Sequence, residues 1–138
     1  MIYESVEMMT VAAARALSDG DICFVGIGLP SAACNLARLT HAPDITLIYE
    51  SGTIATKPDV LPLSIGDGEL CETALTTTPV VEMFRYWLQG GRMTVGFLPR
   101  RTAASSRVRA FSSLRGTASL TKRISDALRP LNVLPVMA

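Results

Sequence analysis

The sequence predicts a three-layer α/β domain, in which helices flank a mainly parallel β-sheet. Short runs rich in β-branched residues alternate with segments of helical hydrophobic period, as expected for strands joined by crossover helices. The chain has 138 residues, of which 49% are hydrophobic and 18% are charged. This composition suits one compact domain with a buried core and argues against a disordered chain.

Composition also limits the expected cellular setting. The longest apolar runs, such as 22–27 and 133–137, are far too short to span a membrane. The first residues include Glu4 and Glu7 and lack the basic start of a signal peptide. Three widely spaced cysteines fit reduced thiols better than a disulfide framework or a zinc site. We therefore expect a cytoplasmic protein without a metal ion.

The amino-terminal part predicts a helix followed by a β-α-β unit. Apolar residues recur with helical period over 4–17, and a buried strand follows over 22–27. A helix over 30–39 then leads to a second buried strand over 45–49. The default connection between two such strands is a parallel, right-handed crossover.

Shorter elements are expected in the remainder of the chain. We predict a loop over 53–59, an irregular strand over 60–64, a short helix or loop over 69–76, a helix over 79–89 and a strand over 93–98. Further on, the pattern is compatible with a capped helix over 119–128 and a last strand over 131–136.

The chain changes character near Pro99. From that residue onward there are eight basic residues and one acid, against five basic residues and eleven acids before it. We divide the chain into an α/β domain over 1–98 and a basic tail over 99–138. The tail lacks interleaved aromatic residues and any recognisable motif, so nucleic acid is not an expected partner.

Glu50 is the residue around which we place the function. The predicted strand over 45–49 runs directly into this carboxylate, and Ser51 and Gly52 then turn the chain. Open α/β sheets bind their ligands at the carboxyl ends of the strands. A carboxylate at that edge is costly to desolvate unless it is paired or used chemically.

Gly26 and Gly28 form a turn that should lie beside Glu50, because parallel strands end at the same edge of a sheet. One interpretation is a dinucleotide site, which needs a glycine-rich turn and an acid about 20 residues further on. Ser31 at the third glycine position and Pro30, which has no N–H for a pyrophosphate, count against it. The other interpretation is covalent catalysis, in which Glu50 attacks an acyl thioester and backbone N–H groups stabilise the oxyanion.

Purely structural roles are alternatives to these functional interpretations. Without a motif around it, Glu50 is as readily a structural acid paired with Lys57 or an arginine. His41 lies in a polar loop, which favours a solvated surface residue. Cys23 and Cys34 fall on predicted buried faces and are expected to be core thiols.

Five short motifs occur in a fixed order over residues 1–98. They are Val-Gly-Ile-Gly-Leu-Pro at 25–30, Tyr-Glu-Ser-Gly at 49–52, Leu-Ser-Ile-Gly-Asp-Gly-Glu-Leu at 63–70, and Tyr-Trp-Leu-Gln-Gly-Gly-Arg at 86–92 with Val-Gly-Phe at 95–97. Each motif is weak alone, but in this order and at these spacings they are fairly specific. Together they resemble the β subunit of class I CoA-transferases, such as the glutaconate and 3-oxoacid CoA-transferases.

The resemblance implies a CoA-transferase-like fold and a cytoplasmic enzyme that works with a separate α subunit, as a heterodimer or heterotetramer. It implies acyl-CoA and carboxylic acid substrates, with coenzyme A as a substrate rather than a permanently bound cofactor, and no metal. The family's catalytic glutamate corresponds to Glu50, which would form a mixed anhydride and then a glutamyl-CoA thioester. Gly26, Gly28, Ser51 and Gly52 would bind the CoA ester or stabilise the oxyanion.

The resemblance stops where the tail begins. Members of the family continue with glycine-rich segments, whereas here Pro-Arg-Arg follows at 99–101 and Gly116 is the only later glycine. We therefore hypothesise that the chain is truncated or frameshifted near residue 98. Two alternatives to a transferase follow: a CoA-ester hydrolase of the same fold in a ring-degradation pathway, and an inactive truncated fragment or non-catalytic partner subunit.

Overall fold

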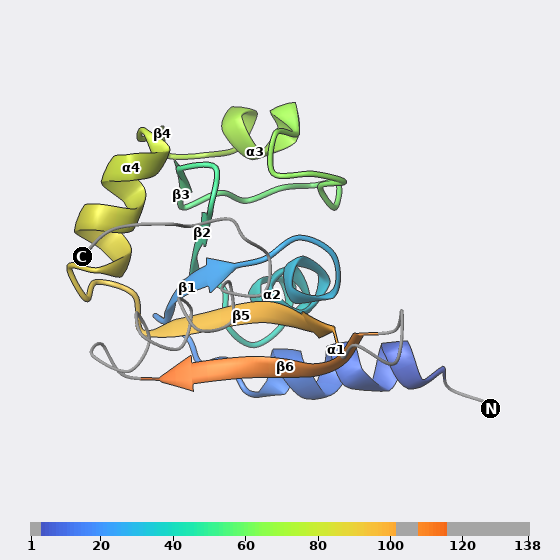
Figure 1. Ribbon diagram of the computed structural model, residues 1–138. Coiled ribbons are helices and arrows are strands. Elements are labelled where there is room, and N and C mark those ends of the chain that lie inside the picture. The colour runs from blue at the N-terminus through green and yellow to red at the C-terminus, as the bar shows by residue number, and fades with distance from the viewer. Residues whose placement is uncertain (1–3, 102–107, 116–138) are drawn as a thin grey trace.

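The computed structural model describes residues 4–101 and 108–115, and a six-stranded sheet runs through this part of the chain (Figure 1). The strand order is β4-β3-β2-β1-β5-β6. The strands are β1 (Ile22–Val25), β2 (Thr46–Tyr49), β3 (Thr53–Ile54), β4 (Thr76–Thr77), β5 (Val95–Arg101) and β6 (Val108–Arg115). The helices are α1 (Ser5–Arg15), α2 (Leu29–Leu39), α3 (Gly68–Glu72) and α4 (Val80–Glu82), and α4 continues as the π-helical segment η1 (Met83–Leu88).

The sheet is parallel at its centre and antiparallel at both margins. β1 pairs in parallel with β2 on one side and with β5 on the other. The pairs β2–β3, β3–β4 and β5–β6 are antiparallel. The predicted three-layer α/β class is confirmed, and its parallel part consists of the three central strands.

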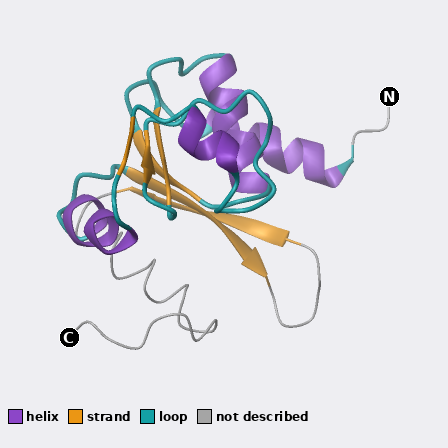
Figure 2. Cartoon of the chain, turned by 90° about the horizontal axis from the view of Figure 1, so that it is seen from above, coloured by secondary structure: helices purple, strands orange, loops and turns teal. Residues whose placement is uncertain are grey.

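Helices lie on both sides of the sheet (Figure 2). Successive residues of the central strands pack in the two cores on opposite faces. Cys23 and Val25 of β1 pack in the core that includes residues of α1 and α2. Phe24, between them, packs with Met83 and Leu88 of η1 on the other face. Burial on both faces explains why these strands read as continuous apolar runs. Fully burying one such side chain contributes about 1.5–3 kcal/mol.

Two predictions on the β3 side of the sheet were wrong. No strand forms over 60–64, and the segment predicted as a loop over 53–59 begins with β3. The helix expected over 79–89 is present, but its second half is π-helical. The N–H of Gln89, for example, donates to the carbonyl oxygen of Phe84 at 2.8 Å, five residues earlier.

β5 continues past the expected end at residue 98 to Arg101, and β6 pairs with it. Pro99 lies in this extension, beyond the last residue of β5 that pairs with β1. Its missing N–H therefore removes no hydrogen bond to β1. The elements expected over 119–128 and 131–136 lie outside the described residues, and the division into a domain and a tail stays a prediction.

Candidate functional site

Glu50 is the first residue of a tight hairpin loop between β2 and β3. The N–H of Gly52 donates to the carbonyl oxygen of Tyr49 at 2.9 Å, which closes the turn. β2 ends at Tyr49 and β3 begins at Thr53, so three residues connect the paired strands. A three-residue connection of this kind combines a tight turn with a left-handed residue that bulges from the ladder. Main-chain hydrogen bonds therefore fix the backbone that carries Glu50.

Gly52 is the left-handed residue of this loop, with φ +96°. A Cβ at this position would overlap the carbonyl oxygen of Thr78. Thr78 lies this close because its own N–H donates to the carbonyl oxygen of Gly52 at 2.9 Å. The chain leaving β4 thus packs directly on the Glu50 turn, and only glycine fits between them.

Gly26 and Gly28 form the neighbouring turn, as the parallel pairing of β1 and β2 requires. These strands pair up to their last residues, so Gly26 and Glu50 both follow the ladder at the same edge of the sheet. The N–H of Gly26 donates to the carbonyl oxygen of Phe97 at 2.9 Å, which ties this turn to β5. Gly28 is the N-cap of α2 and has φ +87° and ψ −130°, a conformation that other residues avoid.

The Glu50 carboxylate is half-buried, and desolvation by this burial raises its pKa above the usual value for glutamate. Within residues 4–101 and 108–115 it forms no hydrogen bond and no ion pair, with Lys57 or any other cation. A carboxyl group with a perturbed pKa and no structural partner is typical of a functional site.

The two turns differ in the backbone donors that they leave available. The N–H groups of Gly26 and Gly52 are bonded to protein carbonyls, so these glycines serve the backbone geometry. In the part of the chain that the structure describes, the N–H groups of Gly28 and Ser51 have no protein acceptor. Stabilising an oxyanion requires pre-placed N–H groups of this kind. A ligand-binding role for all four residues stays a prediction.

Two buried hydroxyl groups close to Glu50 in the sequence lack a hydrogen-bond partner among the described residues. They are Ser51 Oγ and Thr53 Oγ1. Buried hydroxyls without partners are rare and call for an explanation such as a ligand or an ordered water. Sequence reasoning singled out Ser51 but missed Thr53, because a threonine after a turn is ordinary for a strand.

The residues predicted to be structural occupy structural positions. Cys23 and Cys34 are fully buried with their Sγ atoms 3.6 Å apart, and burial raises the pKa of the Cys23 thiol. His41 is exposed, and its ring nitrogens lie 3.1 Å from Thr40 Oγ1 and 3.2 Å from the carbonyl oxygen of Leu17. The described segments hold no cluster of three or more His, Cys, Asp or Glu suited to a metal ion.

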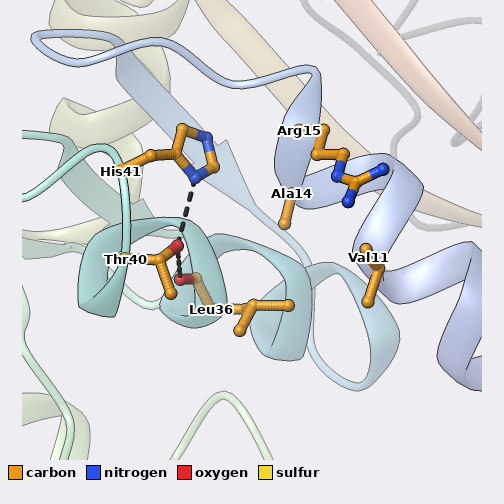
Figure 3. Close-up of a pocket in the computed structure, with 6 residues that line it drawn as sticks. All are labelled: Val11, Ala14, Arg15, Leu36, Thr40 and His41. Atoms are coloured by element: carbon orange, nitrogen blue, oxygen red, sulfur yellow. Dashed lines mark hydrogen bonds between the residues drawn. The ribbon is translucent and has the colours of Figure 1, made fainter.

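A surface hollow of about 240 Å³ lies between α1 and the carboxyl end of α2 (Figure 3). It is lined by Val11, Ala14, Arg15, Leu36, Thr40 and His41. Because α2 begins at the Gly28 turn, its carboxyl end lies at the opposite edge of the sheet from Glu50. The hollow is therefore separate from the candidate site.

These features define an α/β protein with a half-buried acid at the carboxyl edge of its parallel strands. The family model described as Coenzyme A transferase matches residues 6–99. The chain therefore belongs to the coenzyme A transferase family, as its motifs indicated.

Two curated relatives carry more specific names. The B subunit of 3-oxoadipate CoA-transferase from Pseudomonas knackmussii is 72% identical over 96 residues, which cover 70% of this chain and 37% of that protein. The B subunit of glutaconate CoA-transferase from Acidaminococcus fermentans is 37% identical over 65 residues, which cover 47% of this chain and 24% of that protein. The chain thus spans little more than a third of the first relative.

Solved structures agree on the fold. Glutaconate coenzyme A-transferase from Acidaminococcus fermentans superposes with a TM-score of 0.62 and 29% identity, covering 65% of this chain and 35% of that chain. The decarboxylase AibA/AibB superposes with a TM-score of 0.61 over 85% of this chain and 54% of that chain, but at 22% identity this likeness shows the fold alone. No helix among the described residues has the length and apolar character to cross a bilayer.

Proposed function

We propose that this chain supplies the catalytic glutamate of a carboxylic-acid CoA-transferase, with Glu50 as the nucleophile. The observation that carries the proposal is the Glu50 carboxylate itself. It is half-buried, has no ion pair in the described residues, and lies at the sheet edge that also carries the Gly28 turn. Similarity to the B subunits of two CoA-transferases supports this reaction class.

The reaction is an acyl transfer through Glu50. A carboxylate oxygen attacks the thioester carbonyl carbon, the C–S bond breaks, and CoA leaves as a thiolate from a mixed anhydride. The thiolate then attacks the Glu50 carbonyl carbon of the anhydride, which forms a glutamyl-CoA thioester and releases the first acid. A second carboxylate takes over CoA by the reverse of these two steps and regenerates the Glu50 carboxylate.

The surroundings of Glu50 favour this chemistry. Partial desolvation, which raises the pKa of the Glu50 carboxyl group, makes the ionised form a stronger nucleophile. The N–H groups of Gly28 and Ser51 are the donors assigned to the oxyanion that develops on the carbonyl under attack. Coenzyme A takes part as a substrate.

The names of the two relatives support a substrate class for the proposed reaction. We assign dicarboxylic acids related to 3-oxoadipate and glutaconate, because these acids appear in the names of the two relatives. Identity of 72% over the aligned 96 residues favours 3-oxoadipate of the two. A direct competition between the two acids for the same CoA donor tests this preference. We expect 3-oxoadipate to have the higher kcat/KM.

A separate α subunit is the proposed partner, in a cytoplasmic assembly. Of the eleven large apolar side chains that are exposed in the described residues, eight lie between residues 60 and 86. These residues belong to the segments around α3, β4 and α4, at the β4 margin of the sheet (Figure 1). Apolar side chains gathered in this way mark interaction surfaces. We assign this β4 margin to the α subunit.

The test of the catalytic role is to trap the covalent intermediate. The full protein, co-expressed with its partner, is incubated with an acyl-CoA and reduced with borohydride, and the modified peptide is identified by mass spectrometry. Glu50→Gln is expected to leave no adduct and to lower kcat about 10³-fold or more. Glu72→Gln is the matched control, because Glu72 is an exposed carboxylate of α3, and it should behave as the unmodified protein.

Other outcomes separate the alternatives. An ester hydrolase would release CoA without an acceptor acid and leave no adduct on Glu50. A non-catalytic subunit would give neither turnover nor adduct in the presence of the partner. Either result would contradict the transferase proposal.

The partner surface is tested with charged substitutions. Leu63 and Leu75 are 91% and 81% exposed, so Leu63→Asp and Leu75→Asp should not disturb the core. Each is expected to weaken co-purification of the α subunit. Val6→Asp on α1 introduces the same charge away from the β4 margin and should leave the complex intact. Equal binding by all three variants would exclude this surface.

A further inference from the structure

Three hydrogen-bonded side chains, those of Ser31, Asn35 and Tyr49, form a buried cluster between α2 and β2. The hydroxyl oxygens of Ser31 and Tyr49 are 2.7 Å apart. Asn35 Nδ2 donates to Tyr49 Oη at 3.3 Å and to the Ser31 carbonyl oxygen at 2.9 Å. All three residues are at most 4% exposed. Burial raises the pKa of the Tyr49 phenol, so its hydroxyl keeps its proton at neutral pH.

The two ends of this cluster lead directly to the two turns of the candidate site. Ser31 lies in the first turn of α2, three residues after Gly28. Tyr49 is the last residue of β2 and immediately precedes Glu50. The Ser31–Tyr49 hydrogen bond therefore links the glycine turn to the turn that carries the nucleophile.

Arg38 extends the cluster to the chain beyond β3. Its Nε donates to Asn35 Oδ1 at 3.2 Å, and its Nη2 donates to the carbonyl oxygen of Pro58 at 2.8 Å. The last residue of β2 and the segment after β3 are thus both bonded to side chains of α2. This arrangement restrains the hairpin relative to the helix from two sides.

Packing alone does not require the Tyr49 hydroxyl. A phenylalanine ring would fill the same space, and a buried hydroxyl brings a desolvation cost that its hydrogen bonds only offset. A typical hydrogen bond adds only about 0.5–1.5 kcal/mol net to stability, whereas a fully bonded buried network specifies one arrangement of its members. The cluster is therefore better explained by the alignment of the Gly28 turn with the Glu50 turn than by a gain in the stability of the fold.

We infer that Ser31, Asn35 and Tyr49 are positioning residues, which hold the Gly28 turn and the Glu50 turn in the relative arrangement that acyl transfer needs. This inference rests on the proposed function of Glu50. A displacement of about 1 Å in a reacting group lowers rates by about 100-fold. Loss of the cluster should therefore lower kcat, while KM for the CoA ester changes little.

The test uses two variants that remove one hydroxyl each, Tyr49→Phe and Ser31→Ala, in the full protein with its partner. Each is expected to slow formation of the glutamyl-CoA adduct in a single turnover about 10-fold or more, with KM within about 3-fold of the unmodified protein. The amplitude of the adduct counts the folded sites, so the rate refers to folded protein. Ser31→Thr keeps a hydroxyl at this position and should form the adduct at a rate close to that of the unmodified protein.

A double variant and a matched control complete the design. Because Tyr49→Phe and Ser31→Ala both lose the hydrogen bond between Ser31 and Tyr49, the double variant should be slowed by less than the product of the two single effects. The control is Thr94→Val, which removes the bond from Thr94 Oγ1 to Asp21 Oδ1 at 2.9 Å. Thr94 lies at the opposite ends of the central strands, so this variant should lose stability and keep its rate.

Unchanged rates in both Tyr49→Phe and Ser31→Ala would overturn the inference, as would an equal slowing in Thr94→Val. Additive effects in the double variant would also overturn it, because the two side chains would then act independently. Glu50→Gln separates the positioning role of the cluster from the catalytic role of Glu50. If that variant still turns over, the proposed function fails; if it is inactive while Tyr49→Phe is unaffected, only the positioning role fails.

Discussion

Gly28 and Gly52 have similar φ values at the same edge of the sheet, +87° and +96°, but different surroundings. A Cβ on Gly28 would meet no atom within 4 Å, whereas a Cβ on Gly52 would overlap the carbonyl oxygen of Thr78. Gly28 is therefore required only by its own conformation, and Gly52 also by a neighbouring segment. The space beside Gly28 is open, while the packing around Gly52 holds the turn that carries Glu50 in place.

The largest effect is expected from Gly52→Ala. The left-handed conformation and the overlap with Thr78 together should lower the free energy of unfolding by about 3 kcal/mol or more. Urea denaturation of the chain measures this loss. A loss below about 1 kcal/mol would show that the chain leaving β4 moves aside freely, and the contrast between the Gly28 turn and the Glu50 turn would disappear.

Gly28→Ala should cost less, about 1–2 kcal/mol, because only backbone strain is introduced. Gly20→Ala is its control, since Gly20 has φ +78° and also has no atom within 4 Å of an added Cβ. Both variants should lose similar stability. In the full enzyme only Gly28→Ala should slow CoA transfer. Equal transfer rates in Gly28→Ala and Gly20→Ala would argue against a ligand at the Gly28 turn.

Glu50→Gln should stabilise the chain at pH 7, because it removes a partly desolvated charge. The gain should be at most about 1 kcal/mol, since water still screens a half-buried group. The sign follows from the raised pKa of Glu50: the folded state disfavours the ionised carboxylate. This destabilisation is complete above the folded-state pKa and vanishes as the pH falls below the unfolded-state value of about 4.3.

Denaturation midpoints of both proteins between about pH 4 and pH 8 test this prediction. The advantage of Glu50→Gln should shrink as the pH falls. If Glu50→Gln is less stable than the unmodified protein at pH 7, the carboxylate has a stabilising partner. The description of the Glu50 turn would then be wrong. In the active enzyme, kcat/KM should fall on the acid side as the raised pKa of Glu50 is approached.

The smallest effect is expected from Thr53→Val, which removes a buried hydroxyl without a partner in the described residues. The change should lie within about 0.5 kcal/mol or be stabilising, because no hydrogen bond is lost. Thr56→Val is the matched control, since Thr56 is equally buried but donates to the Leu70 carbonyl oxygen at 3.3 Å. It should cost about 1 kcal/mol, and an equal cost for both would mean that Thr53 has a partner.

The sequence was sufficient to place Glu50 and the Gly26–Gly28 turn at one edge. Both follow four-residue strands that are buried on two faces, so their apolar runs are continuous and their ends are marked by glycine or acid. The parallel pairing of these strands then decides the edge. Burial of Cys23 was predicted for the same reason, and burial of Cys34 was predicted because it falls on the buried face of the predicted helix.

The strands β3 and β4 that follow Glu50 could not be predicted from the sequence. Each has only two residues, which is too short to show an alternating pattern. The stretch over 60–64 misled for the opposite reason: Leu61 and Leu63 look like strand residues but are exposed. Nor does the sequence reveal that the N–H groups of Gly26 and Gly52 are already bonded, since this depends on the register of the strands.

The three-residue connection between β2 and β3 also limits how this scaffold can be re-engineered. One residue inserted there would shift the pairing of Ile48 with Ile54 and turn the side chains of β3 to the opposite face. Libraries that vary this scaffold should therefore keep residues 49–54 at constant length and sequence. The exposed loop that precedes α3 contains Val60 and Leu63, and it can be varied in length without disturbing that register.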